Sequence, residues 1–169
     1  MGRLNQNKSH NSEASCICCA SQRTPSFLYR KNNAEIYQCV DCGVGHAQVA
    51  SFDANKYYSE AYFSGEQRDG YSDYKGSQNV LQQQFRQELN TLDQYTYSNQ
   101  TLLELGCAYG YFLKEASSRF TKVFGLEICQ DAVTHCQQIG LDTVKQGDIS
   151  EESLAHFPEV NVAVMLDVI

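Results

Sequence analysis

The chain has 169 residues, of which 42% are hydrophobic, enough to bury the core of one ordinary domain or two small ones. Its net charge of -7 and pI near 5.0 argue against nucleic-acid or anionic-membrane binding driven by overall charge. No stretch has the length of a transmembrane helix, and the N-terminus lacks the apolar segment of a secretory signal. We therefore expect a cytoplasmic protein whose eight cysteines are not paired in disulfides.

The composition changes along the chain in four zones. A polar stretch at 1–15 is expected to be a disordered leader. Five of the eight cysteines lie within 16–48, which we predict to be a zinc-ribbon-like domain. Residues 50–98 are rich in tyrosine and glutamine, and we interpret them as an aromatic-rich helical connector. Residues 99–169 alternate short apolar runs with helical patterns and form the last predicted domain.

Two C-x-x-C pairs mark the cysteine-rich zone: Cys16 with Cys19, and Cys39 with Cys42, with nineteen residues between the pairs. Each pair places two thiolates on one side of a tight turn, and two such turns can complete a tetrahedron of ligands around Zn²⁺. Gly43 suits the left-handed backbone that often follows such a turn. The stretch FLYRKNNAEIYQC reads as a hairpin with KNN as its turn. We therefore predict a structural zinc site with no open coordination position.

The cysteines also allow roles that do not involve this zinc site. The first pair encloses an additional Cys18, which either replaces a ligand or is a bystander. The four cysteines could also be free thiols without metal, or a reactive dithiol, although a redox C-x-x-C pair normally begins a helix. Cys107, Cys129 and Cys136 lie outside this zone, and we expect them in the core of the C-terminal domain.

The second half of the chain has the clearest pattern of secondary structure. A helix is predicted at 78–93, because Leu81, Phe85, Leu89 and Leu92 share one face. Strands are predicted at 101–105, 122–127, 142–147 and 160–166. Helices are predicted at 111–120, 131–140 and 150–157, the last of them capped by Ser150. Strand–helix alternation of this kind is typical of a parallel α/β sheet.

The stretch LLELGCAYGYF predicts a buried strand that enters a glycine turn and then a helix. Gly106 and Gly110 bracket the turn and allow a ligand to approach the backbone. A dinucleotide site would need G-x-G-x-x-G, but Ala108 and Tyr111 occupy two of the three glycine positions. Glu104, just before the turn, suits an ammonium group or a hydroxyl better than a pyrophosphate. An NAD-dependent oxidoreductase is therefore the weaker interpretation of this turn.

The turn resembles motif I of class I S-adenosylmethionine-dependent methyltransferases, in which an acidic residue precedes three alternate glycines. Glu104, Gly106 and Gly110 match that motif, and Ala108 stands in place of the middle glycine. The resemblance implies that the methyl donor contacts the whole turn, which consists of Glu104, Gly106, Cys107, Ala108, Tyr109 and Gly110.

Acidic residues at the ends of the next two predicted strands strengthen the resemblance. Glu127 ends the second strand, where a carboxylate can accept hydrogen bonds from both ribose hydroxyls. In the family the next residue, here Ile128, commonly packs on adenine. An acidic residue after the third strand, here Asp148, binds the adenine amino group in the family, with Ile149 nearby. Three acidic strand ends would thus converge on one crevice, as ligand sites in open α/β sheets do.

The resemblance extends to both sides of these motifs and covers roughly 16–169. The fourth predicted strand ends at Leu166 and Asp167, which the resemblance places near the donor's methionine part and the reacting centre. A four-cysteine region followed by YYSEAYFSG and GYSDY is similar to the C-methyltransferase-like group with an N-terminal zinc-binding region. Tyr71 and Tyr74 would then line or cover the donor pocket, although for either tyrosine alone we slightly favour an ordinary role in core packing or as a surface aromatic residue.

The expected fold class is α/β: an N-terminal zinc ribbon followed by the first half of a Rossmann-like class I methyltransferase sheet. The family's sheet has seven strands and only four are readable here. We therefore expect 99–169 to be a partial S-adenosylmethionine-binding domain, with an uncovered edge at the fourth strand. On this interpretation the chain is a fragment of the full enzyme, and whether it is active as given stays open.

The expected function is methyl transfer from S-adenosylmethionine to a small-molecule acceptor, with Zn²⁺ in a structural role and with no nucleic-acid or membrane partner. No catalytic base can be named, because neither His46 nor His135 lies in a suitable motif, and we expect His135 to be exposed. The acceptor and the oligomeric state are not identified by the sequence. A non-catalytic zinc-ribbon binding module is the alternative from another class of function.

Overall fold

The computed structural model describes residues 15–32, 34–48 and 52–168. Almost all of the predicted leader therefore lies outside the described residues. Within the described part of the chain, no helix has both the length and the apolar character needed to cross a membrane.

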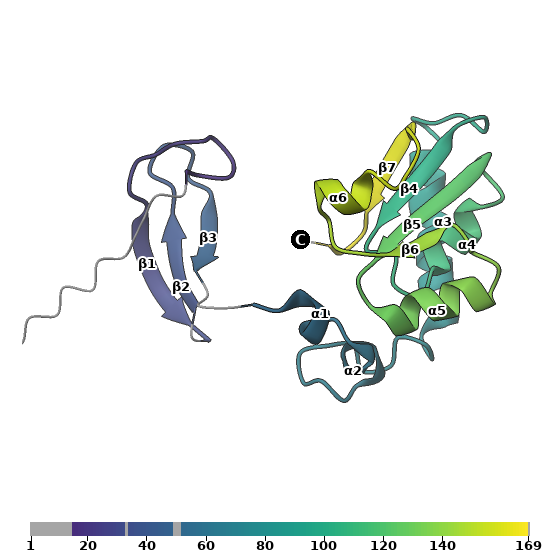
Figure 1. The fold of residues 1–169 in the computed structure, drawn as a ribbon, viewed down its shortest axis with the longest axis horizontal. Coiled ribbons are helices and arrows are strands. Elements are labelled where there is room, and N and C mark those ends of the chain that lie inside the picture. Colours follow the sequence, from purple (N-terminus) through teal and green to yellow (C-terminus); the bar gives the residue numbers. More distant parts are fainter. Residues whose placement is uncertain (1–14, 33, 49–51, 169) are drawn as a thin grey trace, which may run out of the picture. The chain divides into compact units, whose positions relative to one another are not determined.

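The chain divides into two compact units, Met1–Phe52 and Asp53–Ile169. The first unit contains a three-stranded antiparallel sheet with its strands in chain order: β1 (Ser26–Lys31), β2 (Ala34–Gln38) and β3 (Gly45–Gln48) (Figure 1). The predicted hairpin between the two cysteine pairs is confirmed as β1 and β2. The last residue of its KNN turn, Asn33, lies outside the described residues.

The first unit has very little hydrophobic core. Among its described residues, only Ala34 and Cys39 are buried. Cross-strand ring contacts hold part of the sheet instead: Tyr37 meets Phe27 edge to face at 5.6 Å and stacks on His46 at 5.8 Å between ring centroids. Domains this small usually need a metal or disulfides to remain folded, so we expect the cysteines of this unit to stabilise it.

The second unit begins with three helices: α1 (Ala54–Tyr57), α2 (Glu60–Ser64) and α3 (Gln78–Leu92). The predicted helix at 78–93 is confirmed as α3, and its Phe85 and Leu89 are buried as the periodicity requires. Local signals set the limits of the two short helices. The Asp53 side chain accepts a hydrogen bond from the Lys56 N–H at the start of α1, and Gly65 ends α2 with φ +87°.

The rest of the second unit is a parallel sheet, as predicted. Its strands are β4 (Thr101–Leu105), β5 (Lys122–Glu127), β6 (Val144–Gln146) and β7 (Val162–Met165), in the order β6-β5-β4-β7. The intervening helices are α4 (Tyr111–Ala116), α5 (Gln130–Gln138) and α6 (Glu151–Leu154). This is the first half of a Rossmann-like sheet, with β7 at one edge as expected.

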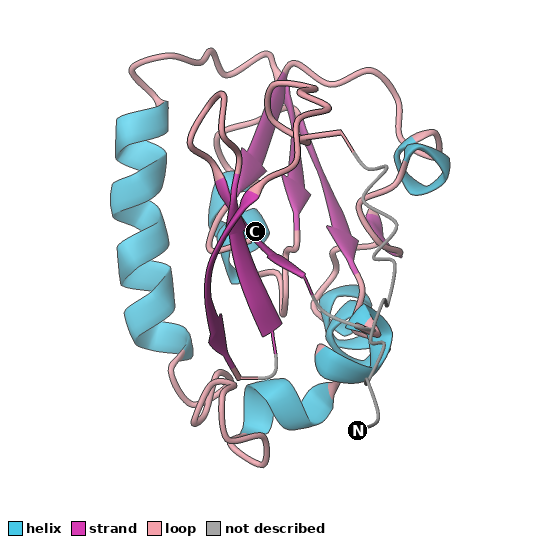
Figure 2. Cartoon of the chain, turned by 90° about the vertical axis from the view of Figure 1, so that its left-hand side faces the viewer, coloured by secondary structure: helices cyan, strands magenta, loops and turns pink. Residues whose placement is uncertain are grey.

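Both faces of the sheet are covered. Leu102 of β4 and Val123 of β5 pack with buried residues of α3, α4 and α5, whereas Leu103 and Phe124 pack on the opposite face near α6. Figure 1 shows α5 and α6 on the two sides of the sheet, and Figure 2 shows the long helix α3 running alongside the strands. The central strands β4 and β5 are therefore buried along almost their whole length.

The strand order also places a crossing point at the centre of the sheet. The chain moves outward from β4 to β5 and β6, then returns to the other side of β4 to form β7. A crevice opens beyond the carboxyl ends of the strands where the direction of such a sheet reverses, and ligands of α/β proteins commonly bind there. The glycine turn that follows β4 lies at this point.

Candidate functional site

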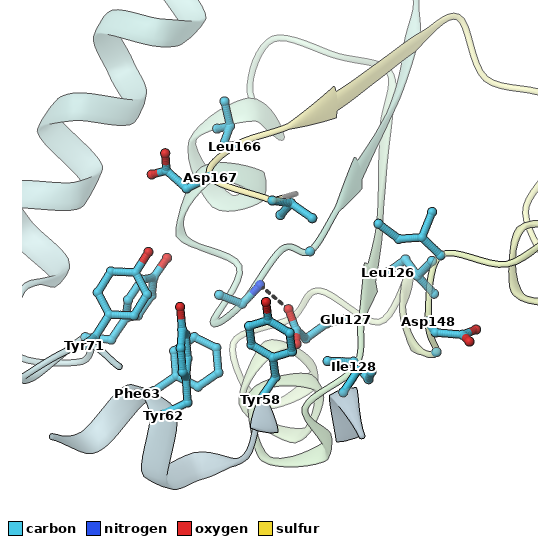
Figure 3. Close-up of a pocket in the computed structure, with 17 residues that line it drawn as sticks. Tyr58, Tyr62, Phe63, Tyr71, Leu126, Glu127, Ile128, Asp148, Leu166 and Asp167 are labelled. Atoms are coloured by element: carbon cyan, nitrogen blue, oxygen red, sulfur yellow. Dashed lines mark hydrogen bonds between the residues drawn. The ribbon is translucent and has the colours of Figure 1, made fainter. Parts of the chain in front are cut away.

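A cavity of about 250 Å³ lies within the second unit, at the carboxyl ends of the four parallel strands. One wall is formed by the turns that follow β4, β5, β6 and β7. The other wall comes from α1, α2 and the loop that follows α2 (Figure 3). Segments from 54 to 168 thus meet around one space, so the site is a product of the tertiary fold rather than of one motif.

The glycine turn forms the floor of the cavity. Gly106 has φ +74°, and its N–H donates to the carbonyl of Leu126 at the end of β5. A Cβ at Gly106 would lie 2.4 Å from the Val168 side chain, so only glycine fits between the turn and the segment after β7. Ala108 has φ +46°, a left-handed backbone that costs an L residue roughly 1–2 kcal/mol. Ala108, which stands at the position of the middle glycine, therefore has a backbone conformation that glycine would adopt more easily.

The Glu127 carboxylate holds this turn from the next strand. One oxygen accepts the Ala108 N–H at 2.7 Å, and the other accepts the Cys129 N–H at 2.8 Å. The side chain lines the cavity although only 5% of the residue is exposed. Burial raises the pKa of Glu127, and the backbone N–H donors of Cys129, Ala108 and Ile128 oppose that rise. A carboxylate has about four lone-pair sites, so these three donors leave one for a ligand hydroxyl.

Two more carboxylates reach the cavity from neighbouring strand ends. Asp148, after β6, accepts hydrogen bonds from the hydroxyls of Ser150 and Ser153, which lower its pKa. Asp167, after β7, has φ +56° and is exposed. No lysine, arginine or histidine is found among the described residues that line the cavity. The lining therefore favours a cationic or hydroxyl-rich ligand and disfavours a pyrophosphate.

The wall opposite the sheet is aromatic. Tyr71 stacks parallel to Phe63 with 6.1 Å between ring centroids and meets Tyr74 edge to face at 4.8 Å. Tyr62 contacts both Phe63 and Tyr71 edge to face. Backbone hydrogen bonds fold the loop back on α2, because the Tyr71 N–H donates to the Tyr62 carbonyl and the Tyr74 N–H to that of Phe63. The rings are thus held in place as one aromatic wall, defined by Tyr58, Tyr62, Phe63, Tyr71 and Tyr74.

The structure brings eight of the twelve residues predicted to contact the donor to this cavity: Gly106, Ala108, Glu127, Ile128, Asp148, Ile149, Leu166 and Asp167. The other four, Glu104, Cys107, Tyr109 and Gly110, do not line it. Tyr109 is fully buried against Phe63 and Tyr74, and a Cβ at Gly110 would lie 2.8 Å from the Cys136 sulfur. These four residues support the turn from the core side of the sheet.

Glu104 has an unusual environment for a carboxylate. The residue is 3% exposed, and its Oε2 atom has no hydrogen-bond partner among the described residues. Burial raises its pKa well above the ordinary range, and the nearby Cys136 and Glu127 add to the rise. A carboxyl group with a raised folded-state pKa stabilises the fold fully only below its unfolded-state pKa, and that contribution is lost as the pH rises.

We expect the substitution Glu104→Gln to stabilise the protein at pH 8 by about 1–3 kcal/mol, because it removes an ionisable group that is poorly solvated. The gain should shrink as the pH falls towards 4.5, the ordinary pKa of a glutamate, because the unfolded chain then begins to bind the same proton. Denaturant unfolding of both proteins at pH 5 and pH 8 measures this difference. If the free energy of unfolding of the variant depends on pH as that of the wild-type chain does, the pKa of Glu104 is not raised. Part of the pH dependence remains in both proteins, because the pKa of Glu127 is also raised.

One expectation about exposure was wrong. His135 is half-buried rather than exposed, because the Tyr109 ring meets it edge to face at 5.2 Å. Sequence reasoning also missed seven cavity-lining residues: Ala54, Tyr58, Tyr62, Phe63, Leu126, Gly147 and Val168. The only signal for the three aromatic ones is the local density of aromatic residues, which does not say where the rings point. Tyr71 and Tyr74 do line the cavity.

The first unit contains a second candidate site, a cluster of Cys16, Cys19, Cys39 and Cys42. Their four sulfur atoms lie within 4.8 Å of one another, with 3.7 Å from Cys16 to Cys42 and 3.7 Å from Cys19 to Cys39. Tetrahedral zinc with Zn–S bonds of 2.3 Å requires sulfur–sulfur distances of about 3.8 Å. The cluster therefore fits one zinc ion, and two cysteine turns beside a three-stranded antiparallel sheet are the arrangement of a zinc ribbon.

The two turns that carry the cysteines have matching backbones. The Ala20 N–H donates to the Cys16 carbonyl, and the Gly43 N–H donates to the Cys39 carbonyl. Both turns end in a residue with left-handed backbone. Ala20, with φ +56°, thus takes the conformation expected of a glycine. Backbone N–H groups of Cys42 and Asp41 lower the pKa of Cys39 to about 6, which favours the thiolate. Cys18 is exposed and is not one of the four clustered cysteines.

Among the comparisons with known proteins, only the one with solved structures gives matches. No protein-family model and no curated protein matches the chain. One structural match is the magnesium protoporphyrin IX methyltransferase ChlM of Synechocystis PCC 6803 with bound SAH, at 19% identity and a TM-score of 0.49 over 68% of this chain and 57% of that one. Another is a SAM-dependent methyltransferase of Archaeoglobus fulgidus, at 22% identity and a TM-score of 0.37 over 51% of this chain and 33% of that one. A SAM-dependent methyltransferase of Aquifex aeolicus matches at 22% identity and a TM-score of 0.36, over 46% of each chain.

The chain spans less than two thirds of the length of the first of these structural matches, and 36% of the YcgJ protein from Bacillus. These three matched structures are described as methyltransferases, and the glycine turn resembles motif I of the methyltransferases that use S-adenosylmethionine. The assignment of the fold as a Rossmann-like half-sheet depends on the strand order and on the parallel pairing of the strands.

Proposed function

We propose that the cavity of the second unit binds S-adenosylmethionine, and that the chain is the donor-binding part of a methyltransferase that acts on a small-molecule acceptor. The observation that carries this proposal is the convergence of Glu127, Asp148 and Asp167 on one cavity that has no cationic residue among its described lining residues. S-adenosylmethionine carries a sulfonium, an ammonium and two ribose hydroxyls, all of which suit carboxylates and aromatic rings.

The proposed placement of the donor follows the strand order. The ribose lies at Glu127 after β5, and the adenine lies between Ile128 and Asp148, towards β6. The methionine part crosses the glycine turn after β4 and ends near Leu166, after β7. The aromatic wall closes the other side and offers ring faces to the sulfonium.

We further propose that the four-cysteine cluster binds one structural zinc ion. The cysteines fit a closed tetrahedral site, and the surrounding unit buries too little apolar surface to fold securely without one. All four coordination positions are occupied by sulfur, so this zinc would have no part in the chemistry of methyl transfer.

Isothermal calorimetry with S-adenosylhomocysteine tests the proposed function directly. We expect saturable binding with one site per chain, and no binding of NADH under the same conditions. Binding of NADH with no response to S-adenosylhomocysteine would favour an oxidoreductase. Absence of both responses from a folded chain would favour a non-catalytic binding module.

A further inference from the structure

The cavity is chemically different at its two ends. Glu127 and Asp148 lie at the β5 and β6 end, where the proposed nucleoside part of the donor binds. Asp167 follows β7, on the far side of the glycine turn, and it is the one carboxylate among the described lining residues at that end. Figure 3 shows Asp167 and Tyr71 on one side of the cavity and Asp148 and Ile128 on the other.

Asp167 has a backbone conformation that is uncommon for a residue with a side chain. Its φ of +56° lies in the left-handed region, which is uncommon for residues other than glycine and is often found at functional sites. The neighbouring Val168 packs so closely on Gly106 that a Cβ there would approach to 2.4 Å. The turn after β7, which carries Asp167, therefore packs directly against the turn after β4.

Tyr71 accompanies Asp167 at this end. Burial raises the pKa of Tyr71, and the charge of Asp167 raises it further, so the phenol stays protonated beside the carboxylate. The ring is fixed by Phe63 and Tyr74, whereas 37% of the residue remains exposed. A hydroxyl and a carboxylate thus both line this end of the cavity.

We propose that Asp167 is the residue that receives the proton of the methyl acceptor, and that Tyr71 positions the acceptor beside it. The inference rests on the proposed function, because it assumes that the donor lies across the glycine turn. It also specifies the acceptor as a group that carries an N–H or an O–H bond, since the paired carboxylate and hydroxyl recognise such a donor.

Methyl transfer from the sulfonium to the acceptor needs only the donor, the acceptor and a group that takes up one proton. A lone pair of the acceptor nitrogen or oxygen forms the new bond to the methyl carbon, while the carbon–sulfur bond breaks and its electron pair remains on sulfur. The acceptor's own proton passes to the Asp167 carboxylate and from there to solvent, because the residue is exposed. The chain contributes alignment and a proton acceptor, and no oxidant or reductant is required.

Sinefungin provides a test that needs no knowledge of the acceptor. This analogue of S-adenosylmethionine carries an amine at the position of the transferred methyl group, so its affinity reports on anionic groups at that point. We expect the wild-type chain to bind sinefungin more tightly than S-adenosylhomocysteine. The substitution Asp167→Asn should lower the preference for sinefungin over S-adenosylhomocysteine, the ratio of the two affinities, roughly ten- to a hundredfold, the range for a charged hydrogen bond.

Two matched variants keep the result interpretable. Asparagine tolerates left-handed backbone, so Asp167→Asn should keep the turn, and Asp142→Asn removes an exposed carboxylate that does not line the cavity. Tyr71→Phe keeps the ring and should weaken sinefungin binding by a smaller factor. Sinefungin preference retained in Asp167→Asn, or absent from the wild-type chain, would overturn the inference. Failure of the wild-type chain to bind either ligand would instead remove the proposed function.

Discussion

Replacing Cys39 by serine is expected to abolish zinc binding and to unfold the N-terminal unit, whereas replacing Cys18 by serine should change neither. Cys39 is buried and its sulfur lies 3.7 Å from that of Cys19, so its loss leaves three ligands and an incomplete tetrahedron. Structural zinc contributes roughly 10–16 kcal/mol to the folding of comparable peptides, far more than this unit can recover from its small core. Cys18 is exposed and lies outside the cluster, which makes it the matched control.

Metal analysis and chelation measure both parts of this expectation. The wild-type chain and Cys18→Ser should each contain about one zinc ion, and Cys39→Ser should contain none. A chelator should expose the Tyr37 ring and the strands around it to proteolysis or hydrogen exchange in the two zinc-containing proteins. A wild-type chain that is metal-free and retains a folded N-terminal unit would contradict the zinc assignment. Zinc loss in Cys18→Ser would instead show that the ligand set is wrong.

Replacing Glu127 by alanine should weaken S-adenosylhomocysteine binding about 10- to 100-fold or more. The carboxylate is proposed to accept the ribose hydroxyls, and a hydrogen bond to a charged group is worth about 1.5–3 kcal/mol. The same side chain also fixes the glycine turn through the Ala108 N–H and the next turn through the Cys129 N–H. Its removal therefore acts on both the ligand contact and the shape of the cavity floor.

Two further variants separate these effects. Glu127→Gln keeps one acceptor oxygen and the side-chain volume, so it should lose less affinity than Glu127→Ala. Glu159→Ala removes an exposed carboxylate that does not line the cavity and should bind like the wild-type chain. Calorimetry gives the affinities, and thermal unfolding verifies that each variant is folded. A folded Glu127→Ala variant with wild-type affinity would exclude Glu127 from the ligand site.

The strands were predictable because burial on both faces leaves a simple pattern. The runs at 101–105 and 122–127 were predicted with the limits that β4 and β5 have, since each is a mainly apolar segment within a sheet covered by helices. The weaker run at 142–147 shortened to β6, Val144–Gln146, which lies at an edge of the sheet. Edge strands bury fewer residues, so their apolar pattern is weaker and their first and last residues are harder to predict from the sequence.

Helix ends were less predictable, because local hydrogen bonds decide them. A helix was predicted at 111–120, but α4 ends at Ala116. The Ser117 hydroxyl donates to the Lys114 carbonyl and the Ser118 hydroxyl to that of Glu115, which gives the backbone an alternative to further helical turns. At α6 the predicted cap was correct, since the Ser150 side chain accepts the Ser153 N–H.

The candidate site was predictable where it depends on strand ends and not where it depends on packing between distant segments. Glu127, Asp148 and Asp167 follow strands, so the parallel topology alone brings them to one edge. Tyr58 and Tyr62 reach the cavity only because α1 and α2 fold over that edge, and no local pattern encodes this position. The roles of all these residues in binding a ligand stay predictions until affinities are measured.

The acidic lining of the cavity has a consequence for how a ligand arrives. Three carboxylates gathered at one opening, with no cation beside them among the described lining residues, create a field that attracts positive charge before contact is made. The association rate of a cationic ligand would then fall as ionic strength rises and the field is screened, while its rate of departure, set by short-range contacts, would change little. The same field would repel phosphorylated metabolites, so the proposed ligand site would discriminate against nucleotides by charge before it does so by shape.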